Sequence, residues 1–188
     1  MLQILDIAGL VLGLLYLWLE LRANIWLWVV GVVMPIVHGY LYYASGLYAD
    51  FGMEVYYTLA AAYGFAMWWR GDRTAKAELP ITHCPPRMMV VAVVATALLW
   101  VGLYQVLVRF TDSTVPLADS FTTALSMVAM WMLARKWVEQ WLAWLVVDAV
   151  CAVLYFYKSI PFTASLYAFY TVMAVVGYRA WHRRVEKS

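Results

Sequence analysis

Charge is scarce in this sequence of 188 residues. Only 13% of the residues are Asp, Glu, Lys or Arg, whereas 66% are hydrophobic and the mean hydropathy is +0.75. Soluble globular proteins carry about 25% charged residues. The shortage of charge excludes an ordinary soluble domain. It indicates an all-α, polytopic membrane protein in which the helical bundle makes up the whole chain.

Cysteines and catalytic motifs are also lacking. The two cysteines, Cys84 and Cys151, have no CxxC or histidine partner at metal-ligand spacing, so the sequence predicts no disulfide framework, metal or cofactor. Neither G-x-S-x-G nor H-E-x-x-H occurs, which argues against a membrane-embedded hydrolase. A retinal photoreceptor needs a lysine inside a late helix, but Lys158 falls in a short turn before Pro161. We therefore predict a protein that is not an enzyme.

Long apolar runs, in contrast, are abundant. A membrane-spanning helix needs about 20 mostly apolar residues. The sequence contains a series of such runs, separated by charged or turn-forming segments such as ELRAN and KSIP. We predict seven transmembrane helices, at residues 3–19, 24–44, 51–69, 88–108, 117–134, 138–157 and 161–181.

Lysine and arginine are distributed unevenly over the predicted loops. If the N-terminus is outside, only Arg109 and Lys158 fall in outer loops. The inside loops and tail then hold Arg22, Arg70, Arg73, Lys76, Arg87, Arg135, Lys136, Arg179, Arg183, Arg184 and Lys187. Because cytoplasmic loops are enriched in these residues, the pattern predicts an N-terminus outside and a short basic tail in the cytoplasm.

The two ends of the sequence resemble each other. The segments YLWLELRANIWLWVVG and MWMLARKWVEQWLAWLVVD are each followed by a tyrosine-rich turn and a helix that ends in YGFAMW or VGYRAW. The offset is about 113 to 116 residues. We predict parallel 3+1+3 repeats, since one linker helix returns the second unit to the orientation of the first. The units are residues 1–70, an inside loop and linker helix at 71–116, and residues 117–188.

One predicted helix carries a carboxylate beside several tryptophans. Trp137, Trp141, Trp144 and Asp148 are spaced by four, three and four positions, which places them on one helix face. A carboxylate at the bilayer centre costs about 2.5–3.5 kcal/mol, so Asp148 is expected to face a cavity or a partner. An aromatic face contributes about 0.5–2 kcal/mol toward holding a cation. The pattern indicates a site for a flat cationic ring.

Two alternatives stay open for this stripe. Trp137 and Trp141 also fit an interfacial aromatic belt, and Asp148 also fits a hydrogen bond to a neighbouring helix. Glu54 and Tyr57 lie at helical spacing on the predicted helix 51–69, and Thr123, Ser126 and Met130 do so on the predicted helix 117–134. Ordinary helix–helix hydrogen bonding is the alternative to substrate contact for these polar residues. The residues predicted to contact substrate are Trp144, Asp148, Trp141, Glu54, Tyr57, Thr123, Ser126 and Met130.

Three sequence elements resemble the PnuC family of bacterial vitamin transporters over nearly the whole chain. They are ARKWVEQWLAW (134–144), GLYADFGMEVYY (46–57) and the paired Gly-x-x-x-Trp helix endings. The resemblance implies a seven-helix 3+1+3 fold related to the SWEET sugar transporters. It further implies a homotrimer in the bacterial inner membrane and uptake of nicotinamide riboside by facilitated diffusion, with trapping by intracellular phosphorylation. The cationic pyridinium of this vitamin suits the predicted tryptophan–carboxylate site.

Two positions depart from the family pattern. Met130 and Glu54 stand where many nicotinamide riboside members have glutamine. A branch of the family carries thiamine, whose thiazolium ring is also cationic, so nicotinamide riboside and thiamine both remain candidate substrates. A proton-coupled carrier that uses Asp148 or Glu54 is the third alternative.

Overall fold

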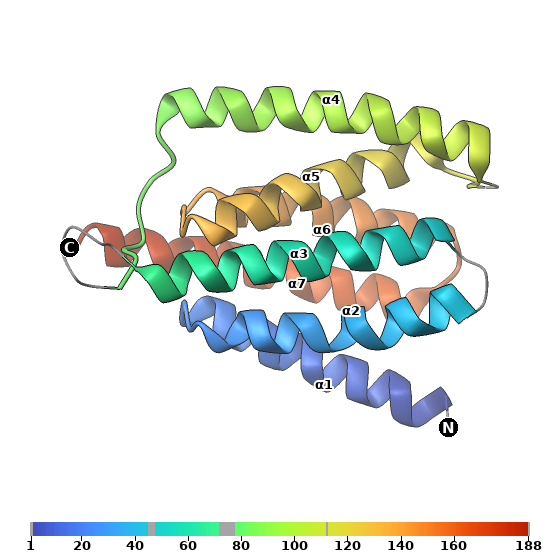
Figure 1. The fold of residues 1–188 in the computed structure, drawn as a ribbon, viewed down its shortest axis with the longest axis horizontal. Coiled ribbons are helices and arrows are strands. Elements are labelled where there is room, and N and C mark those ends of the chain that lie inside the picture. Colours follow the sequence, from blue (N-terminus) through green and yellow to red (C-terminus); the bar gives the residue numbers. More distant parts are fainter. Residues whose placement is uncertain (1, 45–47, 72–77, 112, 188) are drawn as a thin grey trace. The chain divides into compact units, whose positions relative to one another are not determined.

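The computed structural model describes residues 2–44, 48–71, 78–111 and 113–187 (Figure 1). Side chains are described from residue 11 onward, except at 34, 37–38, 41–42, 44 and 48–50. Arg73 and Lys76, which we assigned to the inside on charge, lie outside the described residues, and so does the start of the GLYADF element.

The described residues fold into seven helices, as predicted. They contain one isolated β-bridge, between Thr82 and Trp137, and no named strand. The helices are α1 (Leu2–Leu21), α2 (Trp26–Ala44), α3 (Tyr48–Arg70), α4 (Pro86–Phe110), α5 (Pro116–Ala134), α6 (Gln140–Tyr157) and α7 (Pro161–Val185).

Prolines mark three of the helix starts. Pro86, Pro116 and Pro161 are the first residues of α4, α5 and α7. Proline suits this position because its fixed φ matches the helix and its missing N–H would have no helical partner there. These prolines therefore determine the helix starts through the conformation of the backbone.

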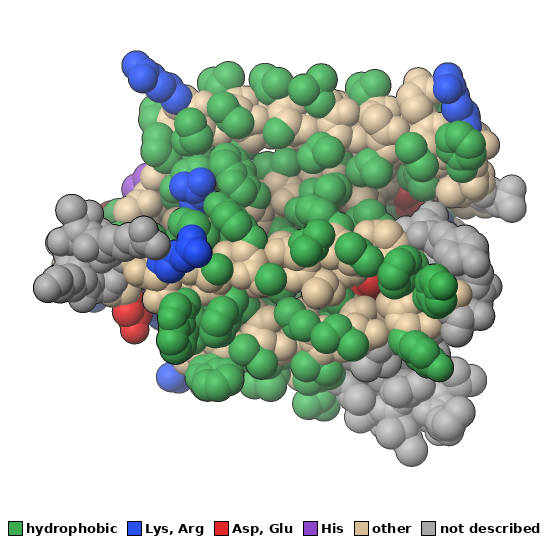
Figure 2. Space-filling view, in the orientation of Figure 1, with side chains coloured by type: hydrophobic (Ala, Val, Ile, Leu, Met, Phe, Trp, Pro, Cys, Tyr) green, Lys and Arg blue, Asp and Glu red, His purple; other side chains and the backbone are tan. Residues whose placement is uncertain are grey.

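Among the residues whose side chains are described, three helices are long and apolar enough to cross a bilayer on length and composition: α4, α5 and α6. The part of α1 searched with them, Val11–Leu21, is apolar but shorter. Both α3 and α7 are rich in tyrosine, and α7 ends with His182, Arg183 and Arg184, which lowers their hydropathy. Figure 2 shows hydrophobic side chains along the surface of α4, and Val90, Val93 and Leu98 are exposed there. Such a surface is stable in lipid rather than in water.

The chain divides into two compact units, Met1–Pro80 and Ile81–Ser188. In the first unit, α2 packs against both α1 and α3. In the second unit, α5 packs against α4 and α6, and α6 forms a hairpin with α7 (Figure 1). Short connections force consecutive helices to run antiparallel as neighbours, which explains the α2–α3 and α6–α7 hairpins.

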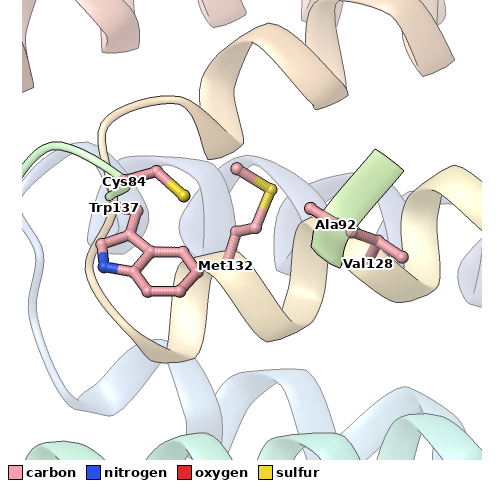
Figure 3. Close-up of a cluster of buried hydrophobic side chains, with 5 residues drawn as sticks. All are labelled: Cys84, Ala92, Val128, Met132 and Trp137. Carbon is pink, nitrogen blue, oxygen red and sulfur yellow. The ribbon is translucent and has the colours of Figure 1, made fainter. Parts of the chain in front are cut away.

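The turn between α5 and α6 belongs to a small hydrophobic core. Trp137 lies in this turn and packs with Cys84, Ala92, Val128 and Met132 (Figure 3). Our prediction that Trp137 shares a helix face with Trp141, Trp144 and Asp148 is therefore wrong. The backbone leaves the helical conformation at Lys136, whose φ is 53°, and α6 begins only at Gln140.

Glu139 fastens the segment before α4 to this turn. One of its carboxylate oxygens accepts a hydrogen bond from the Cys84 backbone N–H at 2.7 Å, and the other lies 2.6 Å from Nδ1 of His83. The Thr82 N–H donates to the Lys136 carbonyl at 3.1 Å, and the Val138 N–H donates to the Thr82 carbonyl at 3.0 Å. We name residues 81–85 the strap.

Candidate functional site

The predicted carboxylate lies inside the second unit. Asp148 is 8% exposed, in the middle of α6, and Trp144 is half-buried one turn before it. Residues four apart share a helix face, so the Trp144 ring and the Asp148 carboxylate lie on the same side of α6. Within the described part of the chain, no lysine, arginine or histidine forms an ion pair with Asp148. The site therefore offers an aromatic face and an uncompensated acid.

Trp141 is held differently, by close packing on α7. It is 1% exposed, and its ring meets Trp181 edge to face with centroids 5.7 Å apart. The ring lies so close to Gly177 that a Cβ added there would be 2.5 Å from Trp141 Cδ2. Only glycine allows this approach, so Gly177 and Trp141 together fix the spacing of the α6–α7 hairpin.

The first unit contains the same arrangement, displaced along the sequence by the offset of the predicted repeat. Trp28 on α2 is 1% exposed and meets Trp68 edge to face at 5.5 Å. A Cβ added at Gly64 would lie 2.3 Å from Trp28 Cζ2. The turn before each hairpin matches too, because Ala23 has a φ of 52° and Lys136 a φ of 53°.

The matching positions differ at the candidate site. At the same offset, Trp144 corresponds to Gly31, and Asp148 corresponds to Pro35. The packing of Trp141 is thus common to both units. At the other two matching positions, the second unit has the Trp144 ring and the Asp148 carboxylate, and the first unit has neither an aromatic nor an acidic side chain. This difference separates residues that build the hairpin from residues that the hairpin fold does not require.

The residues predicted to form a substrate-contacting stripe on α5 differ in their burial. Ser126 and Met130 are buried, but Thr123 is half-buried. The buried hydroxyl at this level belongs to Thr122, which donates to the Ala118 carbonyl at 3.0 Å and lies against the Cys151 thiol of α6. Thr122 was missed because its neighbour Thr123 was placed on the predicted stripe with Ser126 and Met130.

The predicted residues of α3 lie in the other unit. Glu54 is half-buried, and its carbonyl accepts a hydrogen bond from Thr58 Oγ1 at 2.9 Å. Tyr57 is half-buried and meets Tyr56 with ring centroids 5.6 Å apart. Both residues belong to Met1–Pro80, whereas the α5 and α6 residues belong to Ile81–Ser188. Substrate contact by Glu54 and Tyr57 stays a prediction.

Gln140 was not among the predicted site residues. It is the first residue of α6 and is 0% exposed, and neither atom of its side-chain amide has a hydrogen-bond partner among the described residues. Its spacing was the available signal, since it lies four positions before Trp144 and eight before Asp148.

An apolar groove of about 450 Å³ opens elsewhere in the second unit, between α4, α5 and α6. Its lining residues are Trp100, Val115, Pro116, Leu117, Ala118, Phe121 and Val150. A vitamin-sized polar ligand needs a few well-placed polar groups to fix its orientation, and this groove supplies almost none. Its character fits a lipid chain, so the stripe on α6 is the better candidate for a polar ligand.

Comparison with known proteins agrees with this architecture. The chain is 26% identical to the nicotinamide riboside transporter PnuC of Escherichia coli K12, across 94% of this chain and 84% of that protein. It is 29% identical to the riboflavin/roseoflavin transporter RibM of Streptomyces davaonensis, across 97% of this chain and 86% of that protein. A crystal structure of the vitamin B3 transporter PnuC has the same fold, with a TM-score of 0.71 at 23% identity. It covers 94% of this chain and 80% of the other.

The apolar helices and these relatives place the chain among multi-pass membrane transporters, a class of protein distinct from enzymes. The profile of the nicotinamide mononucleotide transporter family matches residues 3–183. The chain belongs to this family, which includes the PnuC transporters.

Proposed function

We propose that this protein takes up nicotinamide riboside by facilitated diffusion, and that intracellular phosphorylation then traps the vitamin. Asp148 carries the proposal: a buried acid that no basic side chain among the described residues neutralises lies on the same helix face as Trp144. Relatives named as nicotinamide riboside transporters support it.

The proposed roles follow from charge and shape. A buried carboxylate without a counter-ion destabilises the empty site, and a cation that enters relieves this cost. The pyridinium ring of the riboside is flat and positively charged, so it stacks on Trp144 while Asp148 faces its charge. Trp141, whose ring is packed against Gly177, is proposed to contact the substrate beside Trp144.

The matched turns and Trp–Gly–Trp contacts in the two units support a duplicated 3+1+3 architecture with parallel, SWEET-like repeats. In such transporters the substrate site lies between the repeats, near the membrane midplane. We propose that Glu54 and Tyr57 contribute from the first repeat, and Thr123, Ser126 and Met130 from the second. The basic loops favour an N-terminus outside and a C-terminus in the cytoplasm of a bacterial inner-membrane protein, which we propose to be a homotrimer.

Two other vitamins are the competing substrates. Thiamine is favoured by its cationic thiazolium and by Met130 and Glu54, which stand where many nicotinamide riboside members of the family have glutamine. Riboflavin is favoured by the 29% identity to RibM. Its ring system is neutral, however, and would leave the charge of Asp148 unmatched. Charge complementarity therefore ranks the two cations above riboflavin.

Isothermal titration of the purified protein with nicotinamide riboside, thiamine and riboflavin in turn tests the proposal. We expect micromolar or tighter binding of the riboside and at least tenfold weaker binding of the other two. Tight binding of thiamine alone would assign the protein to that vitamin. Tight binding of riboflavin alone would remove the role proposed for Asp148 as the partner of a cation.

A further inference from the structure

Gln140 combines complete burial with an unused hydrogen-bonding group. Its side chain is 0% exposed, and both Oε1 and Nε2 lack a partner among the described residues. Leaving a buried donor or acceptor unpaired costs about 1–3 kcal/mol. Native proteins pair nearly all such groups, with protein, water or ligand, so the unpaired amide indicates a missing partner.

The position of Gln140 connects it to the proposed site. Gln140, Trp144 and Asp148 follow one another at intervals of four residues along α6, which places them on one helix face. The indole Nε1 of Trp144 is also buried without a partner among the described residues. A line of polar groups therefore leads from Asp148 toward the first turn of α6.

The first unit provides an internal control for Gln140. At the offset that relates Trp28 to Trp141, the residue that corresponds to Gln140 is Leu27, which is also 0% exposed. The backbone before the two residues is alike, since the Leu27 N–H donates to the Asn24 carbonyl at 3.1 Å and the Gln140 N–H donates to the Trp137 carbonyl at 3.2 Å. The hairpin fold is thus satisfied by a leucine at this position.

The same comparison with the first unit shows that the unpaired indole N–H of Trp141 is no evidence for a ligand. The indole Nε1 of Trp141 is buried without a partner among the described residues, but so is that of Trp28. This feature accompanies the packing that both units share, and it gives no sign of a ligand. The unpaired groups of Gln140 and Trp144 remain as evidence for a ligand, because the first unit has Leu27 and Gly31 at the matching positions and forms the same hairpin without these groups.

We propose that Gln140 is a specificity-determining residue of the transport site and pairs with the carboxamide of nicotinamide riboside. This inference rests on the proposed function. A glutamine amide offers a donor beside an acceptor, which is the complement of a carboxamide. A carboxylate or phosphate is an acceptor and would leave Oε1 unpaired. With the carboxamide at Gln140, the ring stacks on Trp144, and its charged nitrogen and ribose extend toward Asp148.

The variant Gln140→Leu tests this assignment, because it installs the residue that the first unit uses. Replacing a buried, unpaired polar group by an apolar one of similar size is neutral or stabilising, so we expect an unchanged or higher melting temperature. We expect the affinity for nicotinamide riboside to fall by tenfold or more. The matched ligand is pyridine riboside, which keeps the cationic ring and lacks the carboxamide, and we expect the parent and the variant to bind it equally.

Two results would overturn the assignment. One is equal affinity of parent and Gln140→Leu for nicotinamide riboside. The other is a lower melting temperature of the variant together with weaker binding of both ligands, which would show that the amide stabilises the fold. Failure of the parent itself to bind nicotinamide riboside would instead refute the proposed function on which the assignment rests.

Discussion

Trp141 and Trp181 meet edge to face, with ring planes at 88°, and the Trp141 ring fills the space left by the missing side chain of Gly177. Trp28 and Trp68 repeat this relationship over Gly64, at 85°. An edge-to-face aromatic pair contributes about 0.5–1.5 kcal/mol beyond its buried area. Each unit therefore has one helix hairpin whose spacing is set by a glycine and two tryptophans.

Adding a methyl group at either glycine tests this relationship. Gly177→Ala and Gly64→Ala place a Cβ 2.5 Å and 2.3 Å from the nearest tryptophan atoms, which forces the hairpins apart. We expect each substitution to destabilise the fold by about 1–3 kcal/mol, the usual cost of overpacking. Thermal unfolding in detergent, followed by tryptophan fluorescence, measures the effect.

Gly102→Ala is the matched control for these variants. Gly102 lies within α4, and nothing lies within 4 Å of a Cβ added there. Alanine is the better helix former by about 0.5–1 kcal/mol, so this substitution is expected to leave the melting temperature unchanged or raise it. Equal behaviour of all three variants would show that the Trp–Gly contacts do not set the hairpin spacing.

The sequence predicted the helices well because apolar runs and prolines act locally. It also predicted a repeat offset that the Trp–Gly–Trp contacts follow. It failed at Trp137, since spacing alone does not show that Lys136 leaves the helical conformation and breaks the stripe. It also gave no role to Gln140 or to the contacts of Glu139. Burial and the docking of the strap depend on residues far apart in the chain, which periodicity does not report.

Removing the proposed ring contact or the acid is expected to weaken binding. Trp144→Ala removes the stacking face, and Asp148→Ala removes the charge that faces the cation. Each is expected to reduce the affinity for nicotinamide riboside by tenfold or more, since about 1.4 kcal/mol corresponds to one decade. Isothermal titration measures the change, and the matched control is Trp26→Ala, which removes an exposed tryptophan ring of α2 in the first unit. Parent-like affinity in both site variants would show that the stripe is structural.

The rate at which the Cys84 thiol is alkylated measures how firmly the strap is docked. Burial, followed by the nearby Glu139 carboxylate, raises the pKa of the Cys84 thiol. The thiolate is the reactive form, so alkylation of Cys84 is expected to be slow at neutral pH and to accelerate as pH rises toward this raised pKa. In a Cys151→Ala background, Glu139→Ala removes the anion and the two contacts that Glu139 itself makes with the strap, at the Cys84 N–H and at His83 Nδ1. We expect it to speed alkylation by about tenfold at pH 7, because the thiolate fraction and the access both increase.

Glu186→Ala is the matched control for the strap experiment. Glu186 lies 3.5 Å from His182, and its side chain is exposed. Its removal deletes an acid from the second unit but leaves the contacts of Glu139 in place. Alkylation of Cys84 at the parent rate in Glu139→Ala would show that Glu139 does not hold the strap against the turn between α5 and α6.

Transport through the proposed site is expected to be passive. Asp148 has no basic partner among the described residues, and in the proposed mechanism the cationic substrate itself supplies the compensating charge. A carboxylate occupied in this way has no need of a coupling proton. Proteoliposomes loaded with buffer should therefore equilibrate radiolabelled nicotinamide riboside without concentrating it, whether or not a pH gradient is imposed. Accumulation above the external concentration that collapses with a protonophore would establish proton coupling, and its loss in Asp148→Asn would identify this acid as the proton carrier.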